Sequence, residues 1–305
     1  MAQFTADDLM FKPGLMSGER ILITGGGTGL GKVMAEALLM LGAEVYICGR
    51  RGGVVEATAR ELMDAHGGKC VGLACDIRVP EAIAEMLDVI WADGGALSGL
   101  VNNAAGNFIS RTQDLSPRGF DAIANIVFRG SFFVTLECGK RWIAEGRRAS
   151  VISILTTWIW NGGPFTVPSA MSKAGIATMS QSLAVEWGPH GIRFNNIAPG
   201  PFPTEGMSAR LNPGQDQETG GAYSDMSGAP MGRVGEMREL ANLAVYLLHP
   251  LSAYVNGQTI AIDGAAWQAS GGNFSRLAGW GDAEWTAARE AIQTTNAKDR
   301  AARTV

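Results

Sequence analysis

A serine and a lysine stand four residues apart in the segment 168–174, Pro-Ser-Ala-Met-Ser-Lys-Ala. Ser169 offers a hydroxyl and Lys173 an amine, the groups that hold polar ligands and exchange protons. A serine hydroxyl is a far weaker acid than a tyrosine phenol, whose pKa is about 10. The pair therefore marks a candidate polar site that has a serine hydroxyl and an amine but no phenol.

A glycine-rich turn follows the apolar run at 20–24 and precedes a predicted helix. The turn reads Gly25-Gly26-Gly27-Thr28-Gly29-Leu30-Gly31. Glycine permits a tight turn and a close approach of a pyrophosphate to the main chain, and a helix N-terminus attracts negative charge. A strand before the turn and a helix after it distinguish a dinucleotide site from an ordinary glycine-rich turn. The turn therefore predicts a dinucleotide cofactor.

The residues after the second apolar run select among dinucleotides. Arg50 and Arg51 follow the run that ends at Cys48, and no acidic residue occurs between Val45 and Val55. Arginine accommodates a 2′-phosphate, whereas an NAD site usually places Asp or Glu here for the ribose 2′-hydroxyl. We therefore predict NADP(H), with Arg50 as the main phosphate ligand and Arg51 in support.

Later segments are predicted to complete the cofactor site. The carboxylate of Asp76, which Ile77 follows, can accept a hydrogen bond from the adenine amino group. Small residues after the fourth apolar run leave space for the cofactor, and an asparagine there can brace neighbouring backbone. Lys173 is expected to face the nicotinamide ribose, and the segment 199–202 to wrap the nicotinamide amide. The other members of this set are Asn103, Ala104, Gly106, Pro199, Gly200, Pro201 and Phe202.

Short apolar runs alternate with helix-length segments along most of the chain. The runs at 21–23, 45–48, 70–74, 99–101, 150–154, 194–198 and 259–262 are predicted strands. Continuous apolar strands bounded by helices indicate a parallel sheet covered on both faces. We predict one α/β domain over residues 18–264, a Rossmann-type doubly wound sheet of about seven strands. Residues 1–17 are expected to be an N-terminal extension, 202–230 a lid, and 265–305 a tail packed on the domain or a neighbouring subunit.

Composition limits the function classes. The 305 residues are 46% hydrophobic, enough for one large core, and the formal net charge is −4. This charge argues against a nucleic-acid surface, which needs a basic patch. No apolar run reaches the roughly 18–20 residues of a membrane span, and the first eight residues lack a signal-peptide pattern. Four cysteines without a Cys-x-x-Cys motif predict neither a metal nor a disulfide, and a reduced, cytoplasmic protein is expected.

Several of these motifs together resemble the short-chain dehydrogenase/reductase family over residues 18–264. They are TGGGTGLG at 24–31, NNAAG at 102–106, Lys173, and PGPF at 199–202. Most members of that family carry a catalytic tyrosine four residues before the lysine, where this chain has Ser169. A narrower resemblance, through NNAAGNFIS at 102–110, LSP at 115–117, EWGPHGIRFN at 186–195 and SARLNP at 208–213, is to the NADPH-dependent 2,4-dienoyl-CoA reductases. The terminal residues 303–305, Arg-Thr-Val, are not a peroxisomal address of the Ser-Lys-Leu type.

The narrower resemblance implies a chemistry that needs no tyrosine acid. NADPH delivers hydride to the far end of a conjugated dienoyl thioester, charge develops on the thioester oxygen, and a carbon is protonated later. By this resemblance Asn107 holds the thioester oxygen, Ser169 is the family's serine, and Lys173 orients the cofactor. Positions that contact the acyl-CoA fall on Arg78, Phe108, Ser116 and Arg210. A homotetramer is also implied.

Two departures from that subgroup leave other functions open. Trp158 stands where a second tyrosine would share the thioester oxygen; its indole N–H can donate a hydrogen bond but does not ionise usefully. Phe128 and Arg129 stand where the family commonly has a structural asparagine. One alternative is a ketone reductase or alcohol dehydrogenase for a bulky hydrophobic or acyl-CoA substrate, in which Thr156, at the usual catalytic serine position, or Ser169, or a residue of the lid handles the proton. The other is an NADP-binding protein without turnover.

Overall fold

Seven parallel strands form one sheet in the computed structural model, which describes residues 5–204, 229–270, 277 and 279–301. The sheet order is β3-β2-β1-β4-β5-β6-β7. β1 therefore pairs with β2 on one side and with β4 on the other, so the order reverses at β1. The predicted doubly wound parallel sheet is confirmed. The strands are β1 (Arg20–Thr24), β2 (Glu44–Gly49), β3 (Cys70–Ala74), β4 (Gly99–Asn102), β5 (Ala149–Ile154), β6 (Ile192–Pro199) and β7 (Thr259–Ile262).

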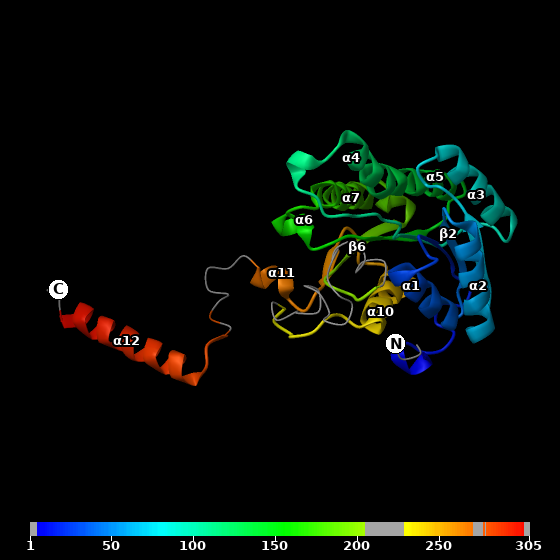
Figure 1. Ribbon diagram of the computed structural model, residues 1–305. Helices are drawn as coiled ribbons and strands as arrows, with labels where there is room; N and C mark the ends of the chain where they lie inside the picture. The colour runs from blue at the N-terminus through cyan, green and yellow to red at the C-terminus, as the bar shows by residue number, and fades with distance from the viewer. Residues whose placement is uncertain (1–4, 205–228, 271–276, 278, 302–305) are drawn as a thin grey trace.

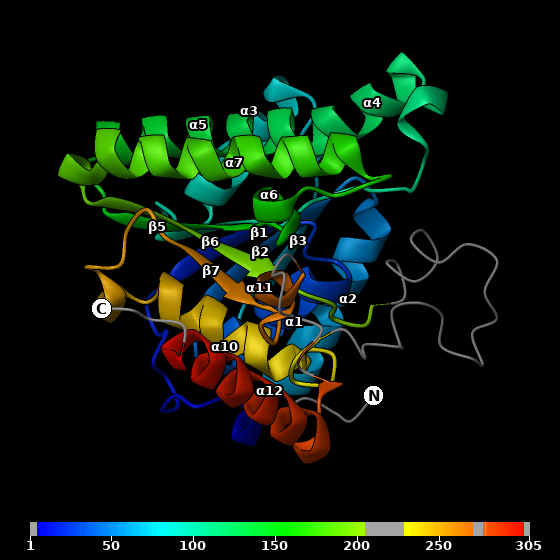
Figure 2. The same cartoon turned by 90° about the vertical axis from the view of Figure 1, so that its left-hand side faces the viewer.

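Helices cover both faces of this sheet (Figure 2). One layer holds α1 (Gly29–Met40), α2 (Gly52–His66) and α10 (Met237–Leu248). The other holds α3 (Pro80–Ala92), α5 (Ser131–Ala144) and α7 (Val167–Glu186). Short helices lie in the connections: η1 (Ala6–Asp8), η2 (Thr112–Asp114), α4 (Pro117–Ala124), α6 (Trp158–Asn161), η4 (Gly188–His190), η5 (Pro250–Ser252) and α11 (Ala266–Ala269).

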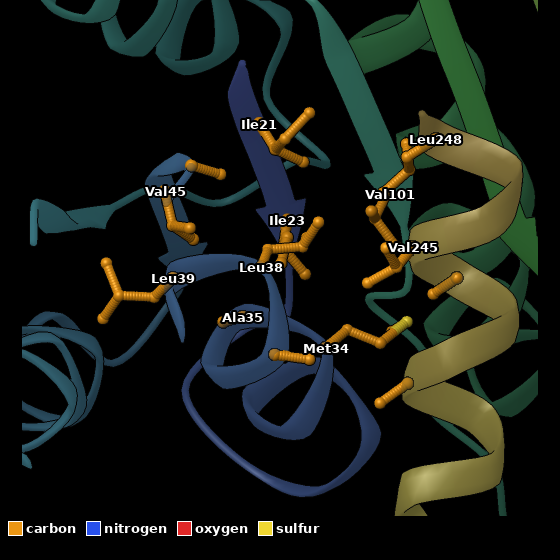
Figure 3. Packing of buried hydrophobic residues seen from close by; sticks show 14 of the residues in the cluster. Ile21, Ile23, Met34, Ala35, Leu38, Leu39, Val45, Val101, Val245 and Leu248 are labelled. Atoms are coloured by element: carbon orange, nitrogen blue, oxygen red, sulfur yellow. The ribbon is translucent and has the colours of Figure 1, made fainter. Parts of the chain in front are cut away.

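The strands are apolar throughout because both of their faces are buried. Successive residues of β1 point to opposite faces: Ile21 and Ile23 join the core under α1 and α10, and Leu22 joins the core under α3 and α5. Figure 3 shows the first of these cores, where Leu38 of α1 and Val245 of α10 approach the strands. This packing fixes the strand ends, and with them the loops that form the site.

The N-terminal extension contributes to the domain. Leu9 and Met16 are buried in the first core. The backbone N–H of Met10 donates to Asn242 Oδ1 at 2.9 Å, and Arg238 contacts Asp8 at 3.2 Å. Both partners lie on α10, so residues 8–16 close this face of the fold.

The helical stretch Pro117–Ala144 is long and apolar enough, by length and composition alone, to cross a membrane. It consists of α4, a π-helical turn η3 (Asn125–Gly130) and α5. One third of its most apolar window is buried. A helix that covers a sheet passes the same test, so the result is weak evidence for a membrane.

The C-terminal segment has two described helices. α11 packs on α6, whereas α12 (Asp282–Ala301) stands away from the sheet layers in Figure 1. The predicted packing of α12 on the domain or on a neighbouring subunit stays a prediction.

Candidate active site

A cavity of about 1000 Å³ lies at the carboxyl ends of the strands. Its walls come from the loops that follow β1 to β6 and from α6, α7 and α11. Ligands of open parallel sheets bind at this edge, beside the point where the strand order reverses. The predicted residues in its lining are Gly25, Gly27, Thr28, Leu30, Arg50, Arg51, Asp76, Ile77, Asn103, Ala104, Gly106, Asn107, Thr156, Trp158, Ser169, Lys173, Pro199, Gly200, Pro201 and Phe202.

The glycine turn is shaped by close backbone contacts. Gly25 and Gly29 have φ of +67° and +56°, a region that favours glycine. A β-carbon on Gly31 would lie 2.5 Å from both Asn103 Nδ2 and the carbonyl oxygen of Gly25. One on Gly26 would lie 2.5 Å from Ile47 Cγ2. Gly26, Gly29 and Gly31 therefore form the turn without lining the cavity, and the turn fits a pyrophosphate at the N-terminus of α1.

Asn103 braces this turn, as predicted. Its Nδ2 donates to the carbonyl oxygens of Thr24 at 3.0 Å and Gly25 at 3.1 Å. The hydroxyl oxygen of Thr24 accepts from the backbone N–H of Asn103 at 3.1 Å and of Ala104 at 3.0 Å. These bonds join the ends of β1 and β4 and hold the backbone of the glycine turn in one geometry.

Two arginines form the cationic end of the cavity. Arg50 and Arg51 line it, and both are exposed. In the described part of the chain, neither guanidinium takes part in an ion pair. α2 begins at the next residue, Gly52, and has no acidic residue in its first turn. The partial positive charge of the helix N-terminus adds to the two cations, so this end suits a phosphate.

Asp76 has a partner that the sequence analysis did not foresee. Arg78, predicted to contact acyl-CoA, donates from Nε to Asp76 Oδ1 at 2.9 Å and from Nη2 to Oδ2 at 2.5 Å. Arg78 does not line the cavity. Its guanidinium holds the pKa of Asp76 below the usual range. Asp76 is therefore an ionised acceptor whose oxygens are shared with Arg78, and adenine would have to share them too.

Ser169 and Lys173 lie together on α7. Both are buried, and four-residue spacing places them on one face of the helix. Lys173 is 6% exposed, and its Nζ donates to the carbonyl oxygen of Ile154 at the end of β5. Burial lowers the pKa of the Lys173 ammonium to about 8 from an ordinary value of 10.5. The amine therefore titrates close to neutral pH, inside the cavity.

Asn107 presents a free amide donor. Its Oδ1 accepts from the backbone N–H of Phe108 at 2.9 Å. Among the described residues, its Nδ2 donates to no partner. The bond on the oxygen fixes the amide orientation, which leaves the NH₂ group available to a ligand carbonyl in the cavity.

Three predicted substrate contacts do not line the cavity, and a fourth lies outside the described residues. Phe108 packs against a small core cluster around Ile123. Ser116 caps α4 by accepting from the backbone N–H of Gly119 at 3.1 Å. Arg78 pairs with Asp76 as described above. Arg210, with most of the predicted lid, lies outside the described residues. The substrate-binding role of these four residues stays a prediction.

The cavity also has walls that the sequence analysis missed. Asn161 of α6 and Trp267 of α11 are separated by more than a hundred residues in the chain, and no local pattern marks them as neighbours. The other lining residues not predicted are Cys48, Gly49, Val54, Val55, Cys75, Ala105, Ile126, Ile154, Leu155, Thr157, Thr204, Ala266 and Ser270.

Comparison with known proteins places the fold and the motifs in one family. The family model described as enoyl-(acyl carrier protein) reductase matches residues 25–265. A short-chain dehydrogenase of Bacillus anthracis is 38% identical, with a TM-score of 0.74 over 82% of this chain and 97% of that one. The chain belongs to the short-chain dehydrogenase/reductase family. It is therefore an oxidoreductase with a nicotinamide dinucleotide cofactor, as the sequence predicted.

Two curated relatives carry a more specific name. A probable 2,4-dienoyl-CoA reductase of Caenorhabditis elegans, (3E)-enoyl-CoA-producing, is 39% identical over 96% of this chain and 95% of its own length. A probable 2,4-dienoyl-CoA reductase of Bacillus subtilis, (2E)-enoyl-CoA-producing, is 36% identical over 83% of this chain and 98% of its own length. The predicted resemblance to this subgroup is confirmed.

Proposed function

We propose that the protein is an NADPH-dependent reductase of 2,4-dienoyl-CoA thioesters, or of closely related enoyl-CoA thioesters. One observation carries the proposal: a single cavity brings together Asn107, Ser169 and Lys173, while among its described lining residues there is no tyrosine. The similarity to proteins named as 2,4-dienoyl-CoA reductases supports it.

The donors of the cavity suit a thioester better than a ketone. Reduction of a ketone ends with a proton on oxygen, which requires a group of suitable acidity beside it. The hydroxyls of Thr156 and Ser169 are weak acids. The Lys173 ammonium, whose pKa burial lowers to about 8, is held by the carbonyl oxygen of Ile154. Most of the lid lies outside the described residues. Reduction of a conjugated thioester instead places negative charge on an oxygen that hydrogen-bond donors can hold, and a proton from solvent is added later to a carbon. The Asn107 amide and the Ser169 hydroxyl are such donors, each typically contributing a factor of about 10²–10³ in rate.

The cofactor site fits NADPH. The glycine turn, which added β-carbons would fill, accepts the pyrophosphate, and Arg50 and Arg51 with the start of α2 accept the 2′-phosphate. Lys173, held by the carbonyl oxygen of Ile154, is positioned to bind the ribose beside the nicotinamide. When bound, NADPH supplies the hydride. The chain's residues then fix both reactants, and this fixed geometry is what accelerates the transfer.

The direct test mixes purified protein with NADPH and 2,4-hexadienoyl-CoA, and follows the absorbance of both compounds. Joint loss of the two absorbances is expected. Tight NADPH binding without turnover of any dienoyl or enoyl thioester would contradict the proposal. A panel of bulky ketones run in parallel would then identify the ketone reductase alternative.

Removing the free amide donor is expected to lower kcat. In Asn107→Ala the developing charge on the thioester oxygen loses one hydrogen bond, so we expect kcat with 2,4-hexadienoyl-CoA to fall about 10²–10³-fold. The Kd of NADPH, measured by fluorescence titration, should stay within twofold. An unchanged kcat would show that Asn107 does not hold the reacting oxygen.

Removing the first arginine is expected to erase the preference for NADPH. A charge-assisted hydrogen bond contributes about 1.5–3 kcal/mol, so in Arg50→Ala the Kd of NADPH should rise roughly ten- to a hundredfold. The Kd of NADH should change little because NADH lacks the 2′-phosphate. Arg60→Ala, an exposed arginine of α2 outside the cavity lining, is the control and should leave both Kd values unchanged.

We also propose a cytoplasmic homotetramer, as the resemblance implied. Exposed apolar side chains lie on α4, η3 and α5 and on the neighbouring α7, where a second copy would cover them. They are Phe120, Phe128, Phe132 and Met171. Light scattering coupled to gel filtration should report four copies, and Phe128→Asp should lower that number.

A further inference from the structure

The indole N–H of Trp267 is buried without a hydrogen-bond partner. In the part of the chain that the structure describes, three buried side-chain polar atoms share this state: Asn102 Oδ1, Ser153 Oγ and Trp267 Nε1. Of these three residues, only Trp267 lines the cavity. A buried donor without an acceptor is unfavourable, and such groups in native proteins often mark a ligand site.

Trp267 is held firmly at the start of α11. Its backbone N–H donates to Asp263 Oδ2 at 2.9 Å, while Asp263 Oδ1 accepts from the backbone N–H of Ala265 at 3.0 Å. Ala265 has a φ of +67°, a left-handed conformation that an alanine adopts only under such constraint. These contacts place the indole ring of Trp267 against α6.

The ring of Trp267 joins α11 to α6. It stacks on Trp160 with ring centroids 4.6 Å apart and an interplanar angle of 25°. The side-chain amide of Asn161 contacts the Ser270 hydroxyl at 2.8 Å, and this hydroxyl donates to the carbonyl oxygen of Trp267 at 2.7 Å. Both views of the fold show α6 and α11 side by side (Figures 1 and 2). Asn161, Trp267 and Ser270 thus form one rigid wall of the cavity, together with Trp158.

This wall belongs to the substrate end of the cavity. The adenosine end is formed after β2 and β3 by Arg50, Arg51 and Asp76, at the far side of the sheet order from β7. α11 follows β7, and α6 follows β5. The stacked rings of Trp160 and Trp267 have apolar faces, and the buried N–H of Trp267 adds a polar group to this wall. Such a wall suits an acyl chain with a carbonyl group.

We propose that the indole N–H of Trp267 donates a hydrogen bond to a carbonyl oxygen of the acyl-CoA substrate. This inference rests on the proposed function. The carbonyl belongs either to the thioester or to an amide of the pantetheine arm, and both offer the same acceptor. Because the N–H has no acceptor among the described residues, a substrate carbonyl would satisfy it without displacing another partner. Trp267 is thereby a substrate-specifying residue contributed by the tail.

The test compares Trp267→Phe, which keeps an aromatic ring and removes the N–H, with Trp267→Ala, which removes both. In Trp267→Phe the Kd of hexanoyl-CoA, measured by calorimetry with NADP⁺ present, should rise about tenfold. The Kd of NADPH should stay unchanged. A fall in kcat with 2,4-hexadienoyl-CoA would assign the bond to the thioester oxygen, and a rise in KM alone would assign it to pantetheine.

Trp280→Phe is the matched control, because Trp280 packs on Trp285 and does not line the cavity. Wild-type values are expected for it. Two results would overturn the inference: Trp267→Phe with wild-type affinity for hexanoyl-CoA, or a weaker affinity of this variant for NADPH in place of the thioester. If the wild-type protein reduces dienoyl-CoA and Trp267→Phe has the same kcat, KM and Kd, the inference about Trp267 is refuted but the proposed function is not. Wild-type protein that neither binds nor reduces acyl-CoA would refute the proposed function, and the inference with it.

Discussion

Replacing Lys173 with methionine is expected to slow turnover at least about a hundredfold and, at pH 7, to make the folded protein more stable. The ammonium is buried, and burial lowers its pKa to about 8 from 10.5. This lowering corresponds to about 3 kcal/mol of destabilisation when the group is charged. Methionine fills a similar volume without the charge but leaves the Ile154 carbonyl oxygen without this donor, which costs about 1 kcal/mol. The free energy of unfolding should therefore rise by about 1–3 kcal/mol.

The gain from Lys173→Met should depend on pH in a defined direction. Below pH 8, the folded and unfolded wild-type chains both carry the proton, and the cost of the buried charge is complete. Between pH 8 and 10.5 the unfolded chain binds the proton while the folded chain does not, so wild-type stability rises with pH. Urea denaturation at pH 7, 8, 9 and 10 should therefore show the difference between variant and wild type shrinking. A difference constant with pH would mean that Lys173 is not buried as a charge.

The loss of activity in the same variant has a separate cause. Without the amine, the nicotinamide ribose loses its positioning contact, and a reactant displaced by about 1 Å can lose about 10²-fold in rate. We expect kcat to fall by at least about that factor. Lys140→Met is the control. Lys140 is an exposed lysine of α5 paired with Glu137, and surface pairs of this kind contribute little. It should leave both kcat and stability unchanged.

The second large effect is expected at Gly31. In Gly31→Ala the new β-carbon would lie 2.5 Å from Asn103 Nδ2 and from the carbonyl oxygen of Gly25. Either the glycine turn must move, or the Asn103 amide must lose its hydrogen bonds to the carbonyl oxygens of Thr24 and Gly25. Overpacking of this kind lowers the free energy of unfolding by about 1–3 kcal/mol. We expect the Kd of NADPH to rise about ten- to a hundredfold, together with a lower melting temperature.

Gly53→Ala is the matched control for this substitution. Gly53 lies in the first turn of α2, and a β-carbon there would meet no atom within 4 Å. Alanine in a helix is favoured over glycine by up to about 1 kcal/mol. The control should therefore keep the wild-type Kd of NADPH and equal or exceed the wild-type stability. Similar losses in both variants would contradict the steric explanation.

The sequence predicted those parts of the site that depend on local order. Short local patterns mark the strand ends, the glycine turn, the two arginines after β2 and the lysine of α7. A parallel sheet brings the carboxyl ends of all its strands to one edge, so these residues could be expected to lie together. The predicted strand at 70–74 matches β3 residue for residue, and that at 259–262 matches β7.

Contacts between distant segments could not be predicted in this way. No periodicity connects Trp267 with Trp160, because their stacking depends on how α11 leaves β7 and how α6 leaves β5. Arg78 was predicted to bind substrate by family position alone, without weighing its proximity to Asp76 two residues earlier. The π-helical turn η3 could not be predicted either, because it leaves an apolar helix pattern almost unchanged.

The order of strands around β1 places the two ends of the cavity in different parts of the sequence. The residues predicted to bind the adenosine half of the cofactor lie in the first hundred positions, after β1, β2 and β3, whereas the wall of α6 and α11 is encoded far downstream, after β5 and β7. On the proposed function, one copy of a duplicated gene can change its acyl specificity through α6 and α11 while it keeps the residues that bind the cofactor. The substrate range can then change while the cofactor stays the same.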